Sequence, residues 1–299
     1  MLISRTFLKL SFAIIFIAVQ AINTPATAQF TSKNGISAVV TTERARAELV
    51  AHSPQGVAAG LDDKITPNTV WVGLQLAHQP HWHTYWKNSG DSGLPTTLIW
   101  TLPVGVMAGD IAWPAPKKIK IGNLTNFGYE DTVLLAVPLV ITPAFKPSLL
   151  NSNLDIKLKA QWLICKQECI PEEGEFAISI PTKGSTAIHA AAFESAWKAQ
   201  PKPLVGDVGG GIPTSRALID GNELKFELQG LPLELRGKTL DFYPETPEVL
   251  ENSAPGKQAW QGAVWRMSWP LSTQRSQSPT VIPIVLKAGD QAWRSEVAV

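Results

Sequence analysis

The 299-residue sequence has only two cysteines, Cys165 and Cys169, so any thiol, disulfide or soft-metal chemistry must take place at this pair. It has no long basic run and a net charge of +1, which argues against nucleic acid or an anionic membrane surface as a partner. Beyond the first 28 residues, no segment is long and apolar enough to cross a bilayer. Ser89 and Ser92 lack the Gly-x-Ser-x-Gly frame of a hydrolase nucleophile, and no paired carboxylates indicate glycoside chemistry.

Residues 1–28 have the features of an export signal. Arg5 and Lys9 supply a positive first region, residues 10–22 are apolar, and Ala26-Thr27-Ala28 is a cleavage sequence of the A-x-A type. We therefore predict a mature chain outside the cytoplasm, in an oxidising compartment where two nearby cysteines form a disulfide. An uncleaved anchor is the alternative, although the apolar run is shorter than the roughly 20 residues of a spanning helix.

The rest of the sequence predicts an all-β protein. It contains 23 prolines, 22 glycines and 11 tryptophans, with short alternating segments between frequent turns. In residues 29–182, β-type runs occur at 70–76, 98–102 and 133–141, and Pro138 in the last run predicts an edge strand or a bulge. Short strands at this spacing favour an immunoglobulin-like β-sandwich.

Residues 183–204 interrupt the pattern and predict a short helical linker. Apolar residues recur at helical spacing over 185–199, with Ser185 as the N-cap, and two prolines follow. The glycine run at 209–211 lacks the flanking elements of a phosphate-binding loop. Residues 205–299 then predict a second β-sandwich domain, in which Asp220-Gly221-Asn222 marks a hairpin. Because this domain has no cysteine or histidine, we expect it to serve as a spacer or docking platform.

Cys165 and Cys169 lie between two predicted strands. On either side of them, residues 154–162 and 175–180 alternate apolar and polar side chains. Four steps along an extended strand cover about 13 Å, whereas the Cα atoms of a disulfide lie roughly 4.4–6.8 Å apart. A bond between these cysteines therefore requires a turn, and we predict a hairpin with both cysteines in its loop.

A Cys165–Cys169 disulfide would close a ring of about five residues. Chain entropy gives about 2 kcal/mol for such a ring, against roughly 4.7 kcal/mol for a hundred-residue loop. We favour a redox-active dithiol in an exposed loop, open to an attacking thiolate; a permanent disulfide and a metal site are the alternatives. Lys166 would favour the Cys165 thiolate. The acidic residues that would disfavour the Cys169 thiolate are Glu168, Glu172 and Glu173.

Three histidines within six residues, His78, His81 and His83, suggest copper or zinc binding, because imidazole is a ligand of both metals. No fourth ligand is nearby in the sequence and Pro80 interrupts the element, so we favour structural histidines at a strand end, with His81 and His83 on one face. A neighbouring set of aromatic residues could line a ligand groove, but is more typical of a sandwich core. Its members are Trp82, Tyr85, Trp86, Trp100 and Trp113.

Four motifs resemble those of one protein family. They are the segment from Trp82 to Gly93, Trp113-Pro114-Ala115-Pro116, Phe127-Gly128-Tyr129-Glu130-Asp131, and the loop from Cys165 to Pro171. In this order they resemble the N-terminal periplasmic domain of the thiol:disulfide interchange protein DsbD family, which are protein-disulfide reductases. The resemblance is closer to the copper-sensitivity suppressor branch, ScsB. It covers residues 36–182 and is weaker beyond residue 205.

The resemblance implies an immunoglobulin-like periplasmic domain that receives electrons from a membrane-embedded domain through a thioredoxin-like domain, and reduces disulfides of periplasmic partners. By this pattern, Cys169 forms mixed disulfides with partners and Cys165 resolves them. An aromatic cap shields the pair in relatives, and Phe127 or Tyr129 would be its counterpart. The resemblance also implies thioredoxin-like partners, a membrane electron-delivery domain in the same chain or in another protein, and no cofactor.

Two features depart from the family pattern. Only three residues separate the cysteines, and the chain carries neither a multi-helix membrane domain nor a Cys-x-x-Cys thioredoxin-like domain. The chain is then either the exported head of a longer reductase or a separate module that a partner reduces. We expect it to relay electron pairs through Cys165 and Cys169. The alternatives are a copper-binding tolerance protein that uses His78, His81 and His83, and a non-catalytic interaction module with an inert disulfide.

Overall fold

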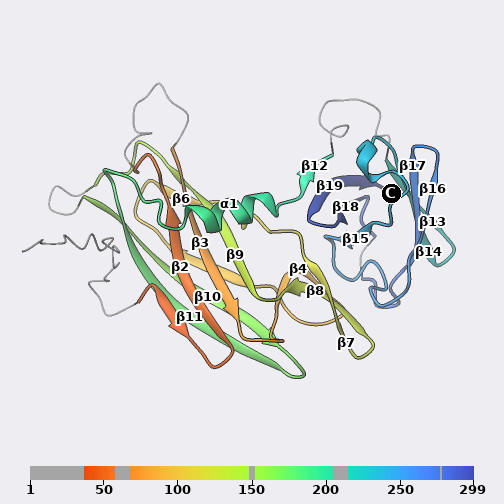
Figure 1. Ribbon diagram of the computed structural model, residues 1–299, viewed down its shortest axis with the longest axis horizontal. Helices are drawn as coiled ribbons and strands as arrows, with labels where there is room; N and C mark the ends of the chain where they lie inside the picture. Colours follow the sequence, from red (N-terminus) through yellow and green to blue (C-terminus); the bar gives the residue numbers. More distant parts are fainter. Residues whose placement is uncertain (1–36, 58–67, 148–151, 205–214, 277) are drawn as a thin grey trace, which may run out of the picture.

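The computed structural model describes residues 37–57, 68–147, 152–204, 215–276 and 278–299, which are almost entirely β-structure around two large apolar cores (Figure 1). The predicted all-β, immunoglobulin-like fold is confirmed. The predicted export signal, residues 1–28, lies outside the described residues. The predicted domain boundaries stay a prediction. We refer to the described residues from 215 onward as the C-terminal unit.

Two sheets enclose the first core. One is antiparallel in the order β1-β2-β3-β9-β6, and the other has the order β11-β10-β5. Successive side chains of a strand face opposite sides, so Leu74, Ile156 and Ile178 point into the space between the sheets. The bounds in chain order are β1 Val39–Thr41, β2 Ala45–His52, β3 Asn68–His78, β5 Thr97–Thr101, β6 Val106–Ala108, β9 Thr132–Ile141, β10 Asn153–Cys165 and β11 Cys169–Pro181.

A third, smaller sheet joins this sandwich to the C-terminal unit. Its strand order is β4-β8-β7, with β4 spanning Thr84–Gly90, β7 Lys117–Ile121 and β8 Leu124–Tyr129. The sheet lies between the two cores in Figure 1. Most of the aromatic residues predicted as core do lie in or against it. Tyr85 and Trp86 are buried, and Trp82, Trp100 and Trp113 are partly buried against the first core.

Pro138 lies in β9, which is paired on both sides. β3 pairs with β9 along its whole length in continuous register, and β6 pairs with residues 139–141, so the predicted edge strand or bulge is wrong. The carbonyl of Pro138 accepts a hydrogen bond from Gly109 N at 2.8 Å, on the β6 side just beyond the end of β6. The backbone N and O atoms of one strand residue point toward the same neighbouring strand. The position of the missing N–H of Pro138 is therefore on the β6 side, where the pairing between β6 and β9 ends.

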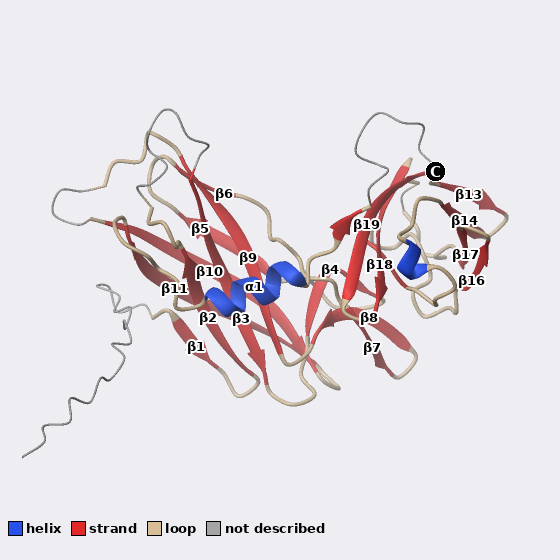
Figure 2. Ribbon diagram, turned by 45° about the horizontal axis from the view of Figure 1, so that its top comes forward, coloured by secondary structure: helices blue, strands red, loops and turns tan. Residues whose placement is uncertain are grey.

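The α-helix α1, Ala190–Lys198, packs on the outer face of the first sheet (Figure 2). Its buried residues Phe193 and Ala196 contact Val50 of β2 and Leu134 of β9. The predicted helix at 185–199 is confirmed in its C-terminal part, but it begins at Ala190 after His189, and Ser185 does not cap it. The helix therefore packs on the first sandwich.

The C-terminal unit forms one sheet with strand order β15-β18-β19-β13-β14-β17-β16, and β12 pairs with β19. The predicted hairpin is confirmed, because Asp220 pairs with Glu223 across Gly221 and Asn222. The bounds are β12 Lys202–Pro203, β13 Arg216–Asp220, β14 Glu223–Leu228, β15 Asp241–Pro244, β16 Lys257–Gln261, β17 Val264–Pro270, β18 Val281–Ala288 and β19 Gln291–Ala298, with a 3-10 turn at Leu233–Leu235.

Candidate active site

Cys165 and Cys169 close the β10–β11 hairpin as a disulfide. The two residues pair directly across the strands, with Cα atoms 4.2 Å apart, and residues 166–168 form the connecting loop. The predicted hairpin is confirmed. However, Cys165 is the last residue of β10 and Cys169 the first of β11, so both lie at strand ends and not in the loop.

The two cysteines differ in exposure. Cys165 is only 1% exposed, whereas Cys169 is exposed to solvent. On the side of β10 away from β11, Cys165 also pairs with His83. The N–H of each residue donates to the carbonyl of the other at 3.0 Å. Of the two residues, Cys169 is therefore the one that another protein can reach.

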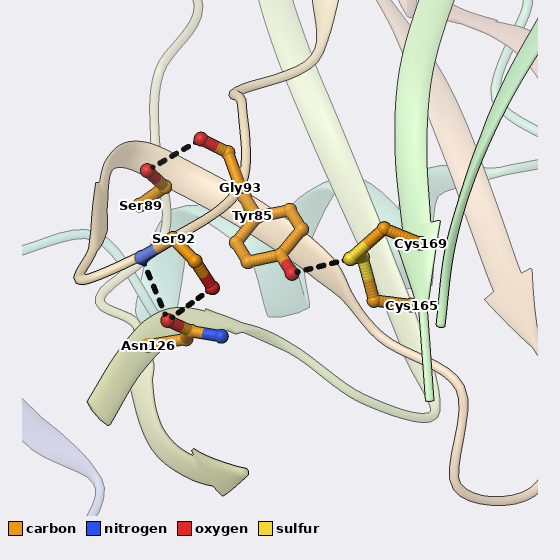
Figure 3. The surroundings of a disulfide bond; sticks show 7 residues. All are labelled: Tyr85, Ser89, Ser92, Gly93, Asn126, Cys165 and Cys169. Atoms are coloured by element: carbon orange, nitrogen blue, oxygen red, sulfur yellow. Dashed lines mark hydrogen bonds between the residues drawn. A yellow bond between two sulfur atoms is a disulfide. The ribbon is translucent and has the colours of Figure 1, made fainter. Parts of the chain in front are cut away.

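Tyr85 covers the disulfide (Figure 3). Its hydroxyl lies 3.5 Å from Sγ of Cys169, within hydrogen-bond distance for sulfur, and the residue is fully buried. The ring of His83 packs edge-on against it, with the two centroids 5.3 Å apart. Burial raises the pKa of Tyr85 above its usual value, so the hydroxyl keeps its proton at neutral pH. It can therefore donate a hydrogen bond to the sulfur.

The predicted counterpart of the aromatic cap is wrong. Phe127 is buried against Tyr243, with ring centroids 5.2 Å apart, and Tyr129 donates its hydroxyl to the carbonyl of Pro114 at 2.7 Å. Tyr85 takes the place next to sulfur instead. The available sequence signal was its spacing from His83, because residues two apart on an extended chain share a face. That signal does not say which face the disulfide meets.

A loop formed by residues 89–93 holds Tyr85 in place (Figure 3). The Ser89 hydroxyl donates to the carbonyl of Gly93 at 2.9 Å, and both N and Oγ of Ser92 lie 3.1 Å from Oδ1 of Asn126. Gly93 has a φ of +95°, and a Cβ on it would lie 2.3 Å from the ring of Tyr85. The backbone of the loop therefore approaches the ring as closely as only glycine allows.

Two of the three acidic residues near Cys169, Glu172 and Glu173, have basic and polar partners. Glu172 accepts from Trp162 Nε1 at 3.0 Å and pairs with Arg44 at 3.3 Å. Glu173 lies 3.3 Å from Nζ of Lys159, and its pKa is lowered, first by the hydrogen bond from Gln161 and then by Lys159. The negative charge expected to disfavour the Cys169 thiolate is therefore partly compensated.

An apolar groove runs beside the disulfide hairpin. It has a volume of about 560 Å³ and is lined by both hairpin strands, at 161–163 and 171–173, and by Leu94, Pro95 and Thr97. Leu94, which directly follows the loop over Tyr85, is 66% exposed. The hairpin thus carries an open apolar groove whose nearest β11 residue, Pro171, is two positions from Cys169.

The structure does not bring the three histidines together as a metal site. Within the part of the chain that the structure describes, no group of three His, Cys, Asp or Glu side chains is placed to hold a metal ion. His78 lies 2.9 Å from the Asp131 carbonyl and 3.0 Å from the Thr84 hydroxyl. His81 lies in a turn with a φ of 72°, so the expectation that it shares a strand face with His83 is wrong.

We expect His83 to make the protein less stable in acid. Burial and then the charge of His78 lower the pKa of His83 from 6.5 to about 4. As the pH falls below 6.5, the unfolded chain takes up a proton at this residue, whereas the folded protein does so only near pH 4. Stability is thus complete above pH 6.5, and about 2–3 kcal/mol of unfolding free energy is lost by pH 4.5.

Urea unfolding of the wild type and of His83→Gln at pH 7 and pH 4.5 checks this prediction. Groups that do not interact with His83 act equally in both proteins and cancel in the comparison, whereas His78, whose charge acts on His83, contributes together with it. The variant should lose at least about 1 kcal/mol less than the wild type over the interval. Equal losses in the two proteins would show that His83 is not the cause.

Comparison with known proteins identifies similar sequences and folds. Residues 55–180, which include Tyr85 and both cysteines, match the family described as thiol:disulfide interchange protein DsbD, N-terminal. The fold is similar to the crystal structure of the N-terminal periplasmic domain of ScsB from Proteus mirabilis, with a TM-score of 0.62 and 16% sequence identity. The match covers 88% of this chain and 97% of that one. No curated protein matches the sequence.

These matches agree with the resemblance inferred from the motifs. The family match covers the disulfide hairpin and the segment that carries Tyr85, and the structural match extends into the C-terminal unit. No helix in the described ranges is long and apolar enough to span a membrane. Residues 55–180 of this chain therefore match the DsbD N-terminal domain family, and the chain shares its fold with the ScsB periplasmic domain.

Proposed function

We propose that this chain is a periplasmic thiol–disulfide exchange module that relays electron pairs through Cys165 and Cys169 to disulfides of partner proteins. The asymmetric disulfide at the hairpin tip carries this proposal, because one of its cysteines is exposed and the other is buried. A staple of this ring size would contribute only about 2 kcal/mol to stability. The family match and the periplasmic origin of the ScsB domain support the same function.

In the first half of the proposed cycle, a thioredoxin-like donor reduces the disulfide. A donor thiolate attacks Sγ of Cys169 and breaks the bond to Cys165, which leaves as a thiolate and takes up a proton. The donor's second thiolate then attacks the donor sulfur of the mixed disulfide and releases Cys169. Two electrons and two protons thus pass from the donor dithiol to the cysteine pair.

In the second half, the pair reduces a client protein. The Cys169 thiolate attacks a client disulfide, and one client sulfur leaves as a thiolate. The thiolate of Cys165 then attacks Cys169, which reforms the internal bond and releases the second client thiol. The Tyr85 hydroxyl, 3.5 Å from the Cys169 sulfur, would donate to the thiolate and favour its formation. The reductive direction is proposed from the family resemblance.

The groove beside the hairpin is the surface we propose for docking of the thioredoxin-like partner. It lies near the exposed end of the disulfide, because residues 171–173 of β11 line it and Cys169 begins that strand. A partner seated there would place its cysteine near Cys169 without entering the buried side at Cys165. The same proposal includes a membrane component that would reduce the thioredoxin-like donor.

Redox equilibration tests the proposal. The protein is equilibrated in glutathione buffers of stepped potential, and the reduced fraction of Cys165 and Cys169 is counted by mass spectrometry after alkylation. We expect a midpoint above about −300 mV, in the range of exchange-active pairs, and exchange with thioredoxin within minutes. A midpoint well below that value, together with no exchange, would identify an inert structural disulfide instead.

A further inference from the structure

The C-terminal unit contacts the same strand that covers the disulfide. Nζ of Lys87 in β4 pairs with Glu245 at 2.8 Å, and Nδ2 of the buried Asn88 donates to the carbonyl of Pro244 at 2.8 Å. Glu245 is itself held by Arg294 at 3.0 Å. These contacts fix two consecutive residues of β4 to β15 and the residue that follows it.

A second contact reaches the loop at residues 89–93. Oγ of Ser253 lies within hydrogen-bond distance of the Asp91 carboxylate and 2.8 Å from the carbonyl of Asn123. Asp91 also accepts a hydrogen bond from Thr125 N at 2.7 Å. The loop is therefore tied to the C-terminal unit at Asp91, two residues from the glycine that packs on Tyr85.

The contact between the units also has a buried aromatic centre. Tyr243 of β15 packs edge-on against Trp86 and Phe127, with ring centroids 6.2 and 5.2 Å away. Nζ of Lys118 lies 5.4 Å from the centre of the same ring and 3.3 Å from Asp241. Because Tyr243 is buried among residues of the first core, the two units form a packed interface and are not merely tethered.

Tyr85 and Trp86 are consecutive residues of β4, so their side chains leave the strand on opposite faces. One meets the sulfur of Cys169 and the other meets the ring of Tyr243. The strand and its loop are thus held between the disulfide and the C-terminal unit. A spacer, one of the two roles expected from sequence beside a docking platform, would not require contacts on the strand that carries Tyr85.

We propose that the C-terminal unit is a positioning element for the disulfide site: by holding β4 and the loop at 89–93, it keeps Tyr85 over Sγ of Cys169. The inference rests on the proposed function, in which Cys169 is the attacked sulfur. Its consequence is that the C-terminal unit limits the access of small thiols to Cys169 and maintains the hydroxyl contact to that sulfur. Loosening Tyr85 through the C-terminal unit should therefore speed reduction of the disulfide by small thiols.

The test uses the full chain with changes in the C-terminal unit only. The double variant Glu245→Gln, Ser253→Ala removes one ion pair and one hydrogen-bonding group from the interface. We expect dithiothreitol to reduce its disulfide at least five-fold faster than in the wild type. Tyr243→Leu, which keeps an apolar side chain at the centre of the interface, should act in the same direction. Glu227→Gln is the matched control, because this residue pairs with Arg216 and Arg266 within the C-terminal unit.

A double-mutant cycle shows whether the effect passes through Tyr85. In a Tyr85→Ala background, the interface variant should change the reduction rate by less than two-fold. In the reduced protein, the pH profile of Cys169 alkylation should shift to higher pH in both the interface variant and Tyr85→Phe, because each loses a donor to the thiolate. A general loss of stability would not produce this shared shift.

Two results would overturn the inference: reduction rates within two-fold of the wild type in both interface variants, or an undiminished effect of the interface variant without Tyr85. Dithiothreitol needs no protein partner, so these measurements are separate from the proposed function. If the interface variants are reduced faster but no exchange with thioredoxin occurs, the positioning role stands and the proposed electron relay is contradicted. Normal exchange with unchanged dithiothreitol rates would remove only the positioning role.

Discussion

A Cys165→Ser variant should accumulate as a mixed disulfide with a thioredoxin-like protein that lacks its second active-site cysteine and carries an aromatic thiol as leaving group on the first, whereas Cys169→Ser should accumulate at least ten-fold less. The reason is exposure: the remaining thiol is Cys169 at the solvent in the first variant, and Cys165, 1% exposed, in the second. Without Cys165, no internal thiolate can attack the mixed disulfide and release the partner. Non-reducing electrophoresis followed by mass spectrometry of the linked peptides measures the two yields.

The double variant Cys165→Ser, Cys169→Ser serves as the background for this measurement and should form no adduct. Both single variants also lack the internal disulfide, so a difference between them cannot arise from the loss of that bond. Equal adduct yields from the two single variants would contradict the assignment of Cys169 as the partner-facing sulfur. A yield that is higher for Cys169→Ser would reverse the roles of the two cysteines.

Replacing Gly93 by alanine should expose the disulfide and destabilise the protein. The new Cβ would lie 2.3 Å from the ring of Tyr85, and the backbone has a φ of +95°, so either the ring or the loop must move. Overpacking in a core and a left-handed backbone at a non-glycine residue together cost about 3 kcal/mol. We expect this loss in urea unfolding and a rise of about ten-fold in the rate of reduction by dithiothreitol.

Gly122→Ala is the matched control for this change. Gly122 also has a positive φ, +58°, but no atom lies within 4 Å of a Cβ built there. The Gly122→Ala variant should therefore lose only the unfolding free energy that a left-handed backbone costs, about 1 kcal/mol. Its disulfide should be reduced at the wild-type rate. If Gly93→Ala behaves like Gly122→Ala in both measurements, Tyr85 is not held by the loop in the way described.

The hairpin is the part of the site that could be predicted from local sequence. Residues 154–162 and 175–180 alternate in polarity, and observed β10 and β11 pair in one continuous register up to the cysteines. A period of two and a short cysteine spacing are properties of neighbouring residues, so they can be read without knowing the rest of the fold. The hairpin at Gly221 was likewise predicted from a local signal, the turn sequence Asp220-Gly221-Asn222.

The cover of the disulfide could not be predicted in this way. Tyr85 and Cys169 are 84 residues apart in the chain, and Asn88 and Pro244, which hold the strand of Tyr85, are 156 apart. Phe127 was an equally plausible aromatic from sequence, and only the packing of Tyr243 against it shows that it serves the interface between the two units. Pro138 was misplaced because its strand pairs on its second side with a short neighbour, β6, formed by residues 106–108.

The amino-acid sequence alone therefore determined an all-β chain with its sulfur chemistry confined to one hairpin tip, because strand periodicity and cysteine spacing are local. The tertiary structure decided that Cys169 is open and Cys165 closed, that Tyr85 covers the bond, and that the C-terminal unit packs on the strand of Tyr85. Those outcomes depend on which distant segments exclude water from a side chain. Burial of this kind is a property of the assembled sheets and not of any one segment.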